Sequence, residues 1–207
     1  MTQKKSRYLL STINSGSTLF CALLCKTIAT WCEPPDLTIA KPGSFIEVDQ
    51  FQLRLAPHLK GKKVFLYRSL PNHVCSGMLH GLFNFDGLHK EWIDNWIAAL
   101  TYGLQSEDVI WIESNDFFRD VRGTMDKVCT HFKIPNIKSL VWADYNVKVA
   151  VPKRQPHQLN LEPPTGVSDY CAKDGIIDTD KALGLLPVQL AVEVVRQNHP
   201  QLNKFIS

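Results

Sequence analysis

Short apolar runs alternate with longer helical patterns through the first two thirds of the chain, and this alternation constrains the fold most. Residues 7–12, 63–67 and 109–112 have the length and composition of β-strands, and a turn and then a helical pattern follow each of them. Strands joined by helices run parallel in one sheet. We therefore predict an α/β domain of three layers, with a central, mostly parallel sheet flanked by helices.

The helical patterns and the remaining segments are assigned by apolar spacing and by Pro and Gly positions. In the helix expected at 87–104, Trp92 and Trp96 are four residues apart, and we assign them to the core. The proline-rich stretch 148–175 is expected to be a long loop, which is either a lid over a site or an element that the pattern fails to reveal. The other expected elements are helices at 18–30, 45–59, 71–83, 116–131 and 188–198 and a short strand at 37–40.

Composition limits the function classes. With 207 residues, 44% hydrophobic and 21% charged, the chain fits one globular domain spanning 1–207. A net charge of +3 is too small to indicate nucleic-acid binding. No apolar run is long enough to cross a membrane, and polar residues interrupt the apolar stretch after Lys4, Lys5 and Arg7, so we predict a cytoplasmic protein without membrane insertion. The six cysteines lack zinc-site spacing, which predicts buried free thiols and no metal.

The segment Thr12-Ile-Asn-Ser-Gly-Ser-Thr18 lies between the first expected strand and the first expected helix. Ligands of open α/β sheets bind at this position, and the N–H groups at the start of a helix favour an anion. Gly16 permits close approach of a ligand to the backbone, and Ser15 and Ser17 add hydroxyl donors. A Walker A loop would have Gly at Ser11 and Lys at Ser17, so hydrolysis of ATP or GTP through a loop lysine is disfavoured. An ordinary serine-rich helix cap is the alternative interpretation.

A second segment strengthens the anion hypothesis. The strand at 63–67 is followed by Arg68, a turn with Pro71, and Ser76 on the next expected helix. The planar guanidinium group of arginine suits a phosphate, and a nearby hydroxyl can share it. The alternatives are a surface ion pair for Arg68 and a hydroxyl on a helix face for Ser76.

Together these segments resemble the family of sulfotransferases that use PAPS (3′-phosphoadenosine-5′-phosphosulfate). Asn14-Ser-Gly-Ser-Thr18 is similar to the family's [RK]-SG-[ST]-T turn, and Arg68 to Ser76 is similar to its R-x-P-x-x-x-x-x-S segment, with the proline one place late. The strand ending at Glu113 and the Thr130-His-Phe-Lys-Ile-Pro135 sequence match two further family patterns in the same order. The resemblance covers residues 7–137, is closest to microbial members with an SGSTLL…EP pattern, and implies a P-loop-like fold. It leaves 148–207 as a less regular C-terminal loop and helix.

The resemblance implies roles for individual residues. The turn would hold the 5′-phosphosulfate of PAPS, and the Arg and Ser of the second segment would hold the 3′-phosphate. Asn14 departs from the family because it replaces a basic residue, and Lys41 is our candidate for the missing cation. The catalytic base would be Glu33 or, alternatively, His80, and the pair Lys153-Arg154 would be a nucleotide cap or simply solvated. The candidate catalytic residues are thus Glu33, Ser17 and Lys41, and the candidate donor-binding residues are Asn14, Ser15, Gly16, Ser17, Thr18, Arg68 and Ser76.

Three functions remain open on these observations. The first is a sulfotransferase that moves a sulfuryl group from PAPS to a hydroxyl or amine of a small acceptor. The second is a catalytically impaired protein of the same fold with a binding or regulatory role. The third and least favoured is a P-loop kinase with a degenerate loop. The sequence specifies neither the acceptor nor the oligomeric state.

Overall fold

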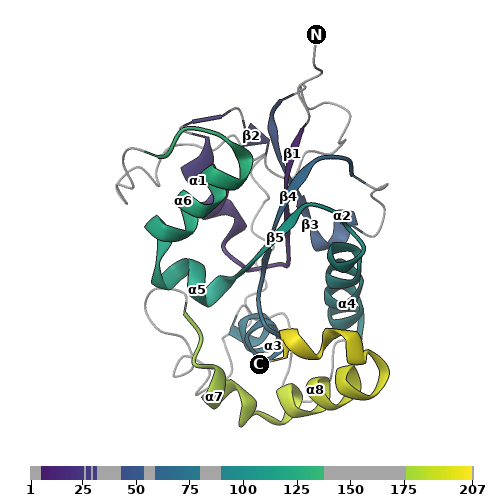
Figure 1. Cartoon of the computed structure of the whole chain (residues 1–207). Coiled ribbons are helices and arrows are strands. Elements are labelled where there is room, and N and C mark those ends of the chain that lie inside the picture. The colour runs from purple at the N-terminus through teal and green to yellow at the C-terminus, as the bar shows by residue number, and fades with distance from the viewer. Residues whose placement is uncertain are drawn as a thin grey trace, which may run out of the picture.

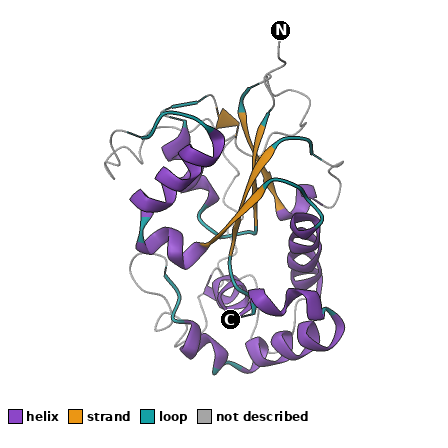
Figure 2. Ribbon diagram, viewed as in Figure 1, coloured by secondary structure: helices purple, strands orange, loops and turns teal. Residues whose placement is uncertain are grey.

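The computed structural model describes residues 6–25, 27–28, 30–31, 43–53, 59–79, 90–137 and 176–206. They form an α/β domain with a parallel sheet between helices, as predicted (Figures 1 and 2). The described elements are β1 (Arg7–Ser11), α1 (Ser17–Leu24), β2 (Thr30–Trp31), β3 (Phe45–Asp49), α2 (Gln50–Leu53), β4 (Lys62–Tyr67), α3 (Leu70–Leu79), α4 (Lys90–Leu104), β5 (Val109–Glu113), α5 (Ser114–Arg119), α6 (Val121–Phe132), α7 (Thr179–Leu183), α8 (Leu186–Asn198) and the 3-10 helix η4 (Pro200–Phe205).

The sheet has the strand order β2-β3-β1-β4-β5, and every neighbouring pair is parallel. Four strands have five or six residues, while β2 has two. The strand β1 lies between β3 and β4, so the chain moves to one side of β1 and then to the other. Such a reversal of strand order is where open α/β sheets bind ligands, beyond the carboxyl ends of the strands.

Two apolar clusters cover the two faces of the sheet. Successive residues of β1 face opposite ways, so Leu9 belongs to one cluster and Leu10 to the other. The cluster that contains Leu9 also contains Phe20 of α1 and Phe117 of α5. The cluster that contains Leu10 includes Trp96 of α4. Trp96 is fully buried, which confirms its predicted place in the core, and Trp92 packs against the same cluster.

The helix predicted at 45–59 is wrong. Residues 45–49 form the strand β3, and only Gln50–Leu53 are helical among the described residues of that range. Every residue of β3 is buried because β1 and β2 flank it in the sheet and helices cover both faces. A strand buried on both faces has no alternation of apolar and polar residues, so its pattern resembles that of a buried helix.

The predicted helix 116–131 is interrupted. Asp120 ends α5 and begins α6, with φ −138° and ψ 74°, and its carboxylate accepts a hydrogen bond from the backbone N–H of Gly123 at 2.8 Å. Aspartate favours such a cap over a helix interior because its side chain competes for backbone N–H groups. The helix predicted at 18–30 is also shorter, since α1 ends at Leu24.

The C-terminal elements are anchored to the core by paired hydrogen bonds. The side-chain amide of Asn115 donates to the carbonyl of Ile177 at 2.9 Å and accepts from the Ile177 N–H at 3.1 Å. Thr179 donates to the side-chain oxygen of Asn72 at 3.1 Å. These contacts place α7 beside α3, close to the carboxyl ends of the strands (Figure 1).

Some of the predicted segments and residues are not among those that the structure describes. The strand at 37–40 and the loop 148–175, with Lys153 and Arg154, lie outside the described residues. Within the described residues, no helix is long and apolar enough to span a membrane. The side chains of Cys21, Cys75 and Cys129 are buried, as predicted, whereas Cys25 is exposed against the prediction. Cys32 and Cys171 lie outside the described residues.

Candidate functional site

The loop between β1 and α1 has a backbone that requires glycine at one position. Asn14 has φ 58° and Gly16 has φ 92°, both in the left-handed region. A Cβ atom at Gly16 would lie 2.8 Å from the ring of Phe118, so a side chain there would be strained and would also collide with that ring. Ser17 and Thr18 begin α1 beyond this loop, and no side chain caps the helix. Its first N–H groups therefore face the loop without a side-chain acceptor.

Side chains from two neighbouring strand ends hold the loop. The backbone N–H of Arg68, just after β4, donates to the Thr12 hydroxyl at 3.0 Å, and its Nε donates to the Asn14 carbonyl at 2.5 Å. The hydroxyl of Ser114, just after β5, donates to the Ser15 carbonyl at 2.6 Å. In a trans peptide the carbonyl and the following N–H point in opposite directions. The N–H groups of residues 15 and 16 therefore point away from these donors, as an anion-binding loop requires.

Buried polar atoms without a hydrogen-bond partner gather around this loop. They come from the ends of β1 and β4, from the loop itself, from α2 just after β3, and from α3. Buried polar atoms are normally paired, so such a group indicates a place that a ligand or solvent completes. Among the described residues these atoms are the hydroxyls of Ser11, Ser15 and Ser69, Nδ2 of Asn14, Nε2 of Gln50, and both ring nitrogens of His73.

His73 is fully buried, and its ring lies against two tryptophans. Its ring stacks on Trp92 with centroids 5.0 Å apart and lies 6.4 Å from the ring of Trp96. Burial, followed by the charge of Arg68, lowers the pKa of His73 to about 3, and the backbone of Ile13 acts weakly the other way without reaching hydrogen-bonding geometry. The imidazole is therefore neutral at pH 7 and presents one donor and one acceptor beside the loop.

Glu113, at the end of β5, organises the neighbouring turns. Its carboxylate accepts hydrogen bonds from the backbone N–H groups of Ser69 at 3.3 Å, Asp116 at 3.3 Å, and Asn115. Burial raises the pKa of Glu113, whereas these N–H groups and the charge of Arg68 oppose that rise. The group thus ties the turn after β4 to the start of α5, and this turn carries Arg68.

The structure brings together some of the predicted site residues. Asn14, Ser15 and Arg68 meet at the loop, and Arg68 also lies 6.0 Å below the ring centre of Phe118. Ser76 is buried on α3, three residues or about one helical turn beyond His73, on the same side of the helix. Of the three candidate catalytic residues, Ser17 begins α1, whereas Glu33 and Lys41 lie outside the described residues, as does the alternative base His80.

Sequence reasoning missed Gln50, Ser69 and His73 as members of the site. Ser69 follows Arg68 directly after a predicted strand, so its position was a usable signal. Gln50 fell inside the wrongly predicted helix, which hid its place after β3. Its Oε1 accepts from the backbone N–H of Ile13 at 3.1 Å, so Gln50 supports the loop from the side opposite Arg68.

Fold and site together define an α/β protein with a parallel sheet whose carboxyl edge carries unpaired polar groups around a glycine-containing loop. No protein-family model matches the chain, and no curated protein matches its sequence.

Proposed function

We propose that the chain is a sulfotransferase that uses PAPS to sulfate a hydroxyl or amine of a small acceptor, on a P-loop-like fold. The observation that carries this proposal is the set of buried, unpaired polar atoms around the β1–α1 loop, at the side where Arg68 crosses it. Hydroxyl, amide and backbone N–H groups are the donors that phosphate and sulfate oxygens need. The residues present therefore fit an anionic nucleotide.

The donor nucleotide would supply the sulfuryl group, and the chain would bind and orient it. The backbone N–H groups of the loop and the Ser15 hydroxyl would hold the phosphosulfate end. Arg68 and Ser76 would hold the 3′-phosphate, which distinguishes PAPS from ATP. Glu33 remains the proposed acceptor of the proton that the attacking hydroxyl or amine loses.

A second function is favoured by Asn14. Its side-chain amide is a neutral donor, whereas the resemblance expects a cation at this position. A charged donor contributes about 1.5–3 kcal/mol and a neutral one about 1 kcal/mol. In the described part of the chain, the cation that contacts the loop is Arg68, and its Nε already bonds to the Asn14 carbonyl. A protein that binds the nucleotide without turnover is therefore the alternative.

Calorimetric binding of adenosine 3′,5′-bisphosphate tests the donor site, with 5′-AMP and ATP as controls. We expect the bisphosphate to bind most tightly, and Arg68→Ala to weaken binding at least tenfold. Arg68→Lys keeps the charge but loses the planar fork, so it should lie between the two. Arg119→Ala is the matched control, because Arg119 is exposed and its ion pair is with the exposed Asp116. The proposal would be wrong if Arg68→Ala and Arg119→Ala had equal effects, or if the bisphosphate did not bind.

Incubation with PAPS and a panel of hydroxyl and amine acceptors separates the two functions. Sulfated product together with adenosine 3′,5′-bisphosphate would support the sulfotransferase, and Glu33→Gln should then lower kcat more than it raises KM. Tight nucleotide binding without product, and no gain of activity in Asn14→Lys, would favour the binding role.

A further inference from the structure

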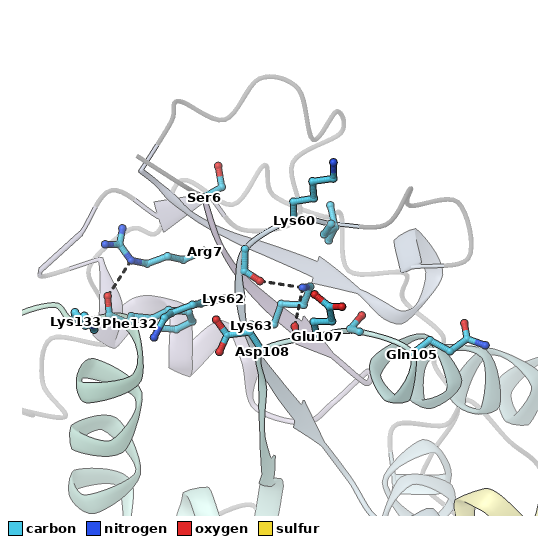
Figure 3. A pocket seen from close by; sticks show the side chains of 13 residues that line it. Ser6, Arg7, Lys60, Lys62, Lys63, Gln105, Glu107, Asp108, Phe132 and Lys133 are labelled. Atoms are coloured by element: carbon cyan, nitrogen blue, oxygen red, sulfur yellow. Dashed lines mark hydrogen bonds between the residues drawn. The ribbon is translucent and has the colours of Figure 1, made fainter. Parts of the chain in front are cut away.

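A hollow lies at the edge of the sheet opposite the candidate site, where the strands begin. Its volume is about 790 Å³, and four segments line it: the start of β1, the turn leading into β4, the turn between α4 and β5, and the end of α6 (Figure 3). Since parallel strands share their direction, this amino edge is separated from the β1–α1 loop by the length of the strands. It is therefore distinct from the candidate donor site.

The hollow concentrates the positive charge of the protein. Its lining includes five basic residues and two acidic ones, which leaves +3. The whole chain also carries +3, so the rest of the sequence is balanced. Within the described residues, no carboxylate forms an ion pair with any of the five. The basic residues are Arg7, Lys60, Lys62, Lys63 and Lys133, and the acidic ones are Glu107 and Asp108.

Backbone carbonyls hold three of these cations in place. Nε of Arg7 donates to the Phe132 carbonyl at 3.4 Å and its Nη1 to Gly43 at 2.9 Å. The ammonium of Lys62 donates to His131 at 2.5 Å, and that of Lys63 donates to two further carbonyls at 2.9 and 3.0 Å. An ammonium group has three N–H donors and a guanidinium group has five. These bonds therefore fix the positions of the charged groups and leave each of them with N–H donors for a ligand. Carbonyls also carry only partial charge, so they do not neutralise the cations.

The other two cations of the hollow, Lys60 and Lys133, are not held by backbone carbonyls of the described residues. The side chains of Lys60 and Lys133 are exposed and make no hydrogen bond to the described residues. They lie on different segments of the rim, on the turn before β4 and just after α6 (Figure 3). Lys133 caps the C-terminal end of α6 through its backbone N–H, which leaves its ammonium group uninvolved. Like charges brought together around a hollow repel one another, so an anion placed between them is stabilised.

We propose that this amino-edge hollow binds a small polyanion that carries two or more phosphate or sulfate groups. Cations on separate segments suit a ligand with several anionic groups, since each segment can contact a group of its own. Lys62, Lys63 and Arg7 are anchored and would form the floor, and Lys60 and Lys133 would close on the ligand from the rim. The ligand is recognised by charge and hydrogen bonds, because the hollow offers few apolar side chains.

Calorimetry with inorganic tripolyphosphate at low salt tests the site. The variant Lys60→Gln/Lys133→Asn removes both rim charges, and asparagine suits the left-handed backbone of Lys133, whose φ is 55°. We expect it to bind at least tenfold more weakly than the unmodified protein. The control Lys90→Gln/Lys181→Gln removes two exposed lysines that do not line the hollow, and its affinity should change by less than about twofold. Equal weakening of the two variants, or no binding of tripolyphosphate, would overturn the proposal.

Two further measurements locate the ligand. Arg68→Ala should leave tripolyphosphate affinity within about twofold, and a tenfold loss would mean that the ligand occupies the carboxyl edge instead. Tripolyphosphate should also protect Lys60 and Lys133 from acetylation, measured by mass spectrometry, while Lys90 and Lys181 stay reactive. Uniform labelling with and without tripolyphosphate would contradict the site.

Discussion

The same substitution at two buried serines should have opposite effects on stability. Ser69 and Ser114 follow β4 and β5 at the same edge of the sheet, and both are at most 1% exposed. The hydroxyl of Ser114 donates to the Ser15 carbonyl at 2.6 Å, whereas the hydroxyl of Ser69 has no partner among the described residues. Replacing each by alanine therefore removes either a satisfied donor or an unsatisfied one.

The expected magnitudes follow from these partners. Ser114→Ala removes a hydrogen bond to a buried carbonyl, which costs about 1–2 kcal/mol of the unfolding free energy. Ser69→Ala removes an unpaired buried hydroxyl and so should be neutral or stabilising, by up to about 1 kcal/mol. The two variants should then differ by about 2 kcal/mol, although they delete the same atom at equally buried positions.

Urea denaturation of the ligand-free protein, followed by circular dichroism, measures the difference directly. The denaturation midpoint of Ser114→Ala should fall, and that of Ser69→Ala should stay or rise, with equal slopes. If the Ser69 hydroxyl serves the nucleotide, Ser69→Ala should also weaken binding of adenosine 3′,5′-bisphosphate about fivefold. Equal destabilisation by both variants would refute the interpretation of the unpaired atoms as ligand-binding groups.

Three other changes test the loop, the histidine and the C-terminal anchor. Gly16→Ala should destabilise the protein by about 2–4 kcal/mol in thermal unfolding, through left-handed backbone strain and overpacking. The control Gly184→Ala should cost less than about 1 kcal/mol, because Gly184 has an ordinary φ of −73°. The pKa of His73 is about 3 in the folded protein and 6.5 in the unfolded chain, so the unfolded state binds a proton first as the pH falls. The free energy of unfolding should therefore fall below pH 6.5, by about 2 kcal/mol at pH 5. His73→Gln should remove this dependence of stability on pH. Asn115→Ala should accelerate hydrogen exchange of the Ile177 amide more than tenfold, and unchanged exchange would exclude the anchor.

The sequence predicts three of the five described strands, β1, β4 and β5, because they are short apolar runs followed by turns. It failed at β3, whose residues are all buried and include the charged Glu47. Neither a period of two nor a polar face marks such a strand, and only its neighbours in the sheet reveal it. The break at Asp120 was readable in principle, since aspartate favours a helix cap, but apolar periodicity on both sides concealed it.

The site was predictable only in part, for a related reason. A turn between a strand and a helix is local, so the residues Asn14 to Thr18 could be named from sequence spacing. The partners of that turn come from distant segments: Arg68 is 54 residues from Asn14, and Ser114 is 99 residues from Ser15. Of these two partners only Arg68 was predicted, because it directly follows a predicted strand, where a bound anion would lie. The role of Ser114 depends on the order of the strands, which a single sequence does not specify.

The two proposed sites should respond differently to salt. At the carboxyl edge the donors of the described residues are mostly neutral hydroxyl, amide and N–H groups, with Arg68 as the cation at the loop. At the amino edge the excess charge of the whole chain surrounds one hollow. Neutral hydrogen bonds are not screened by ions, whereas attraction between exposed charges weakens as the Debye length falls from about 30 Å at 0.01 M to about 8 Å at 0.15 M salt. Binding of tripolyphosphate should therefore weaken more steeply with salt than binding of adenosine 3′,5′-bisphosphate, and equal slopes would mean that both ligands occupy one site.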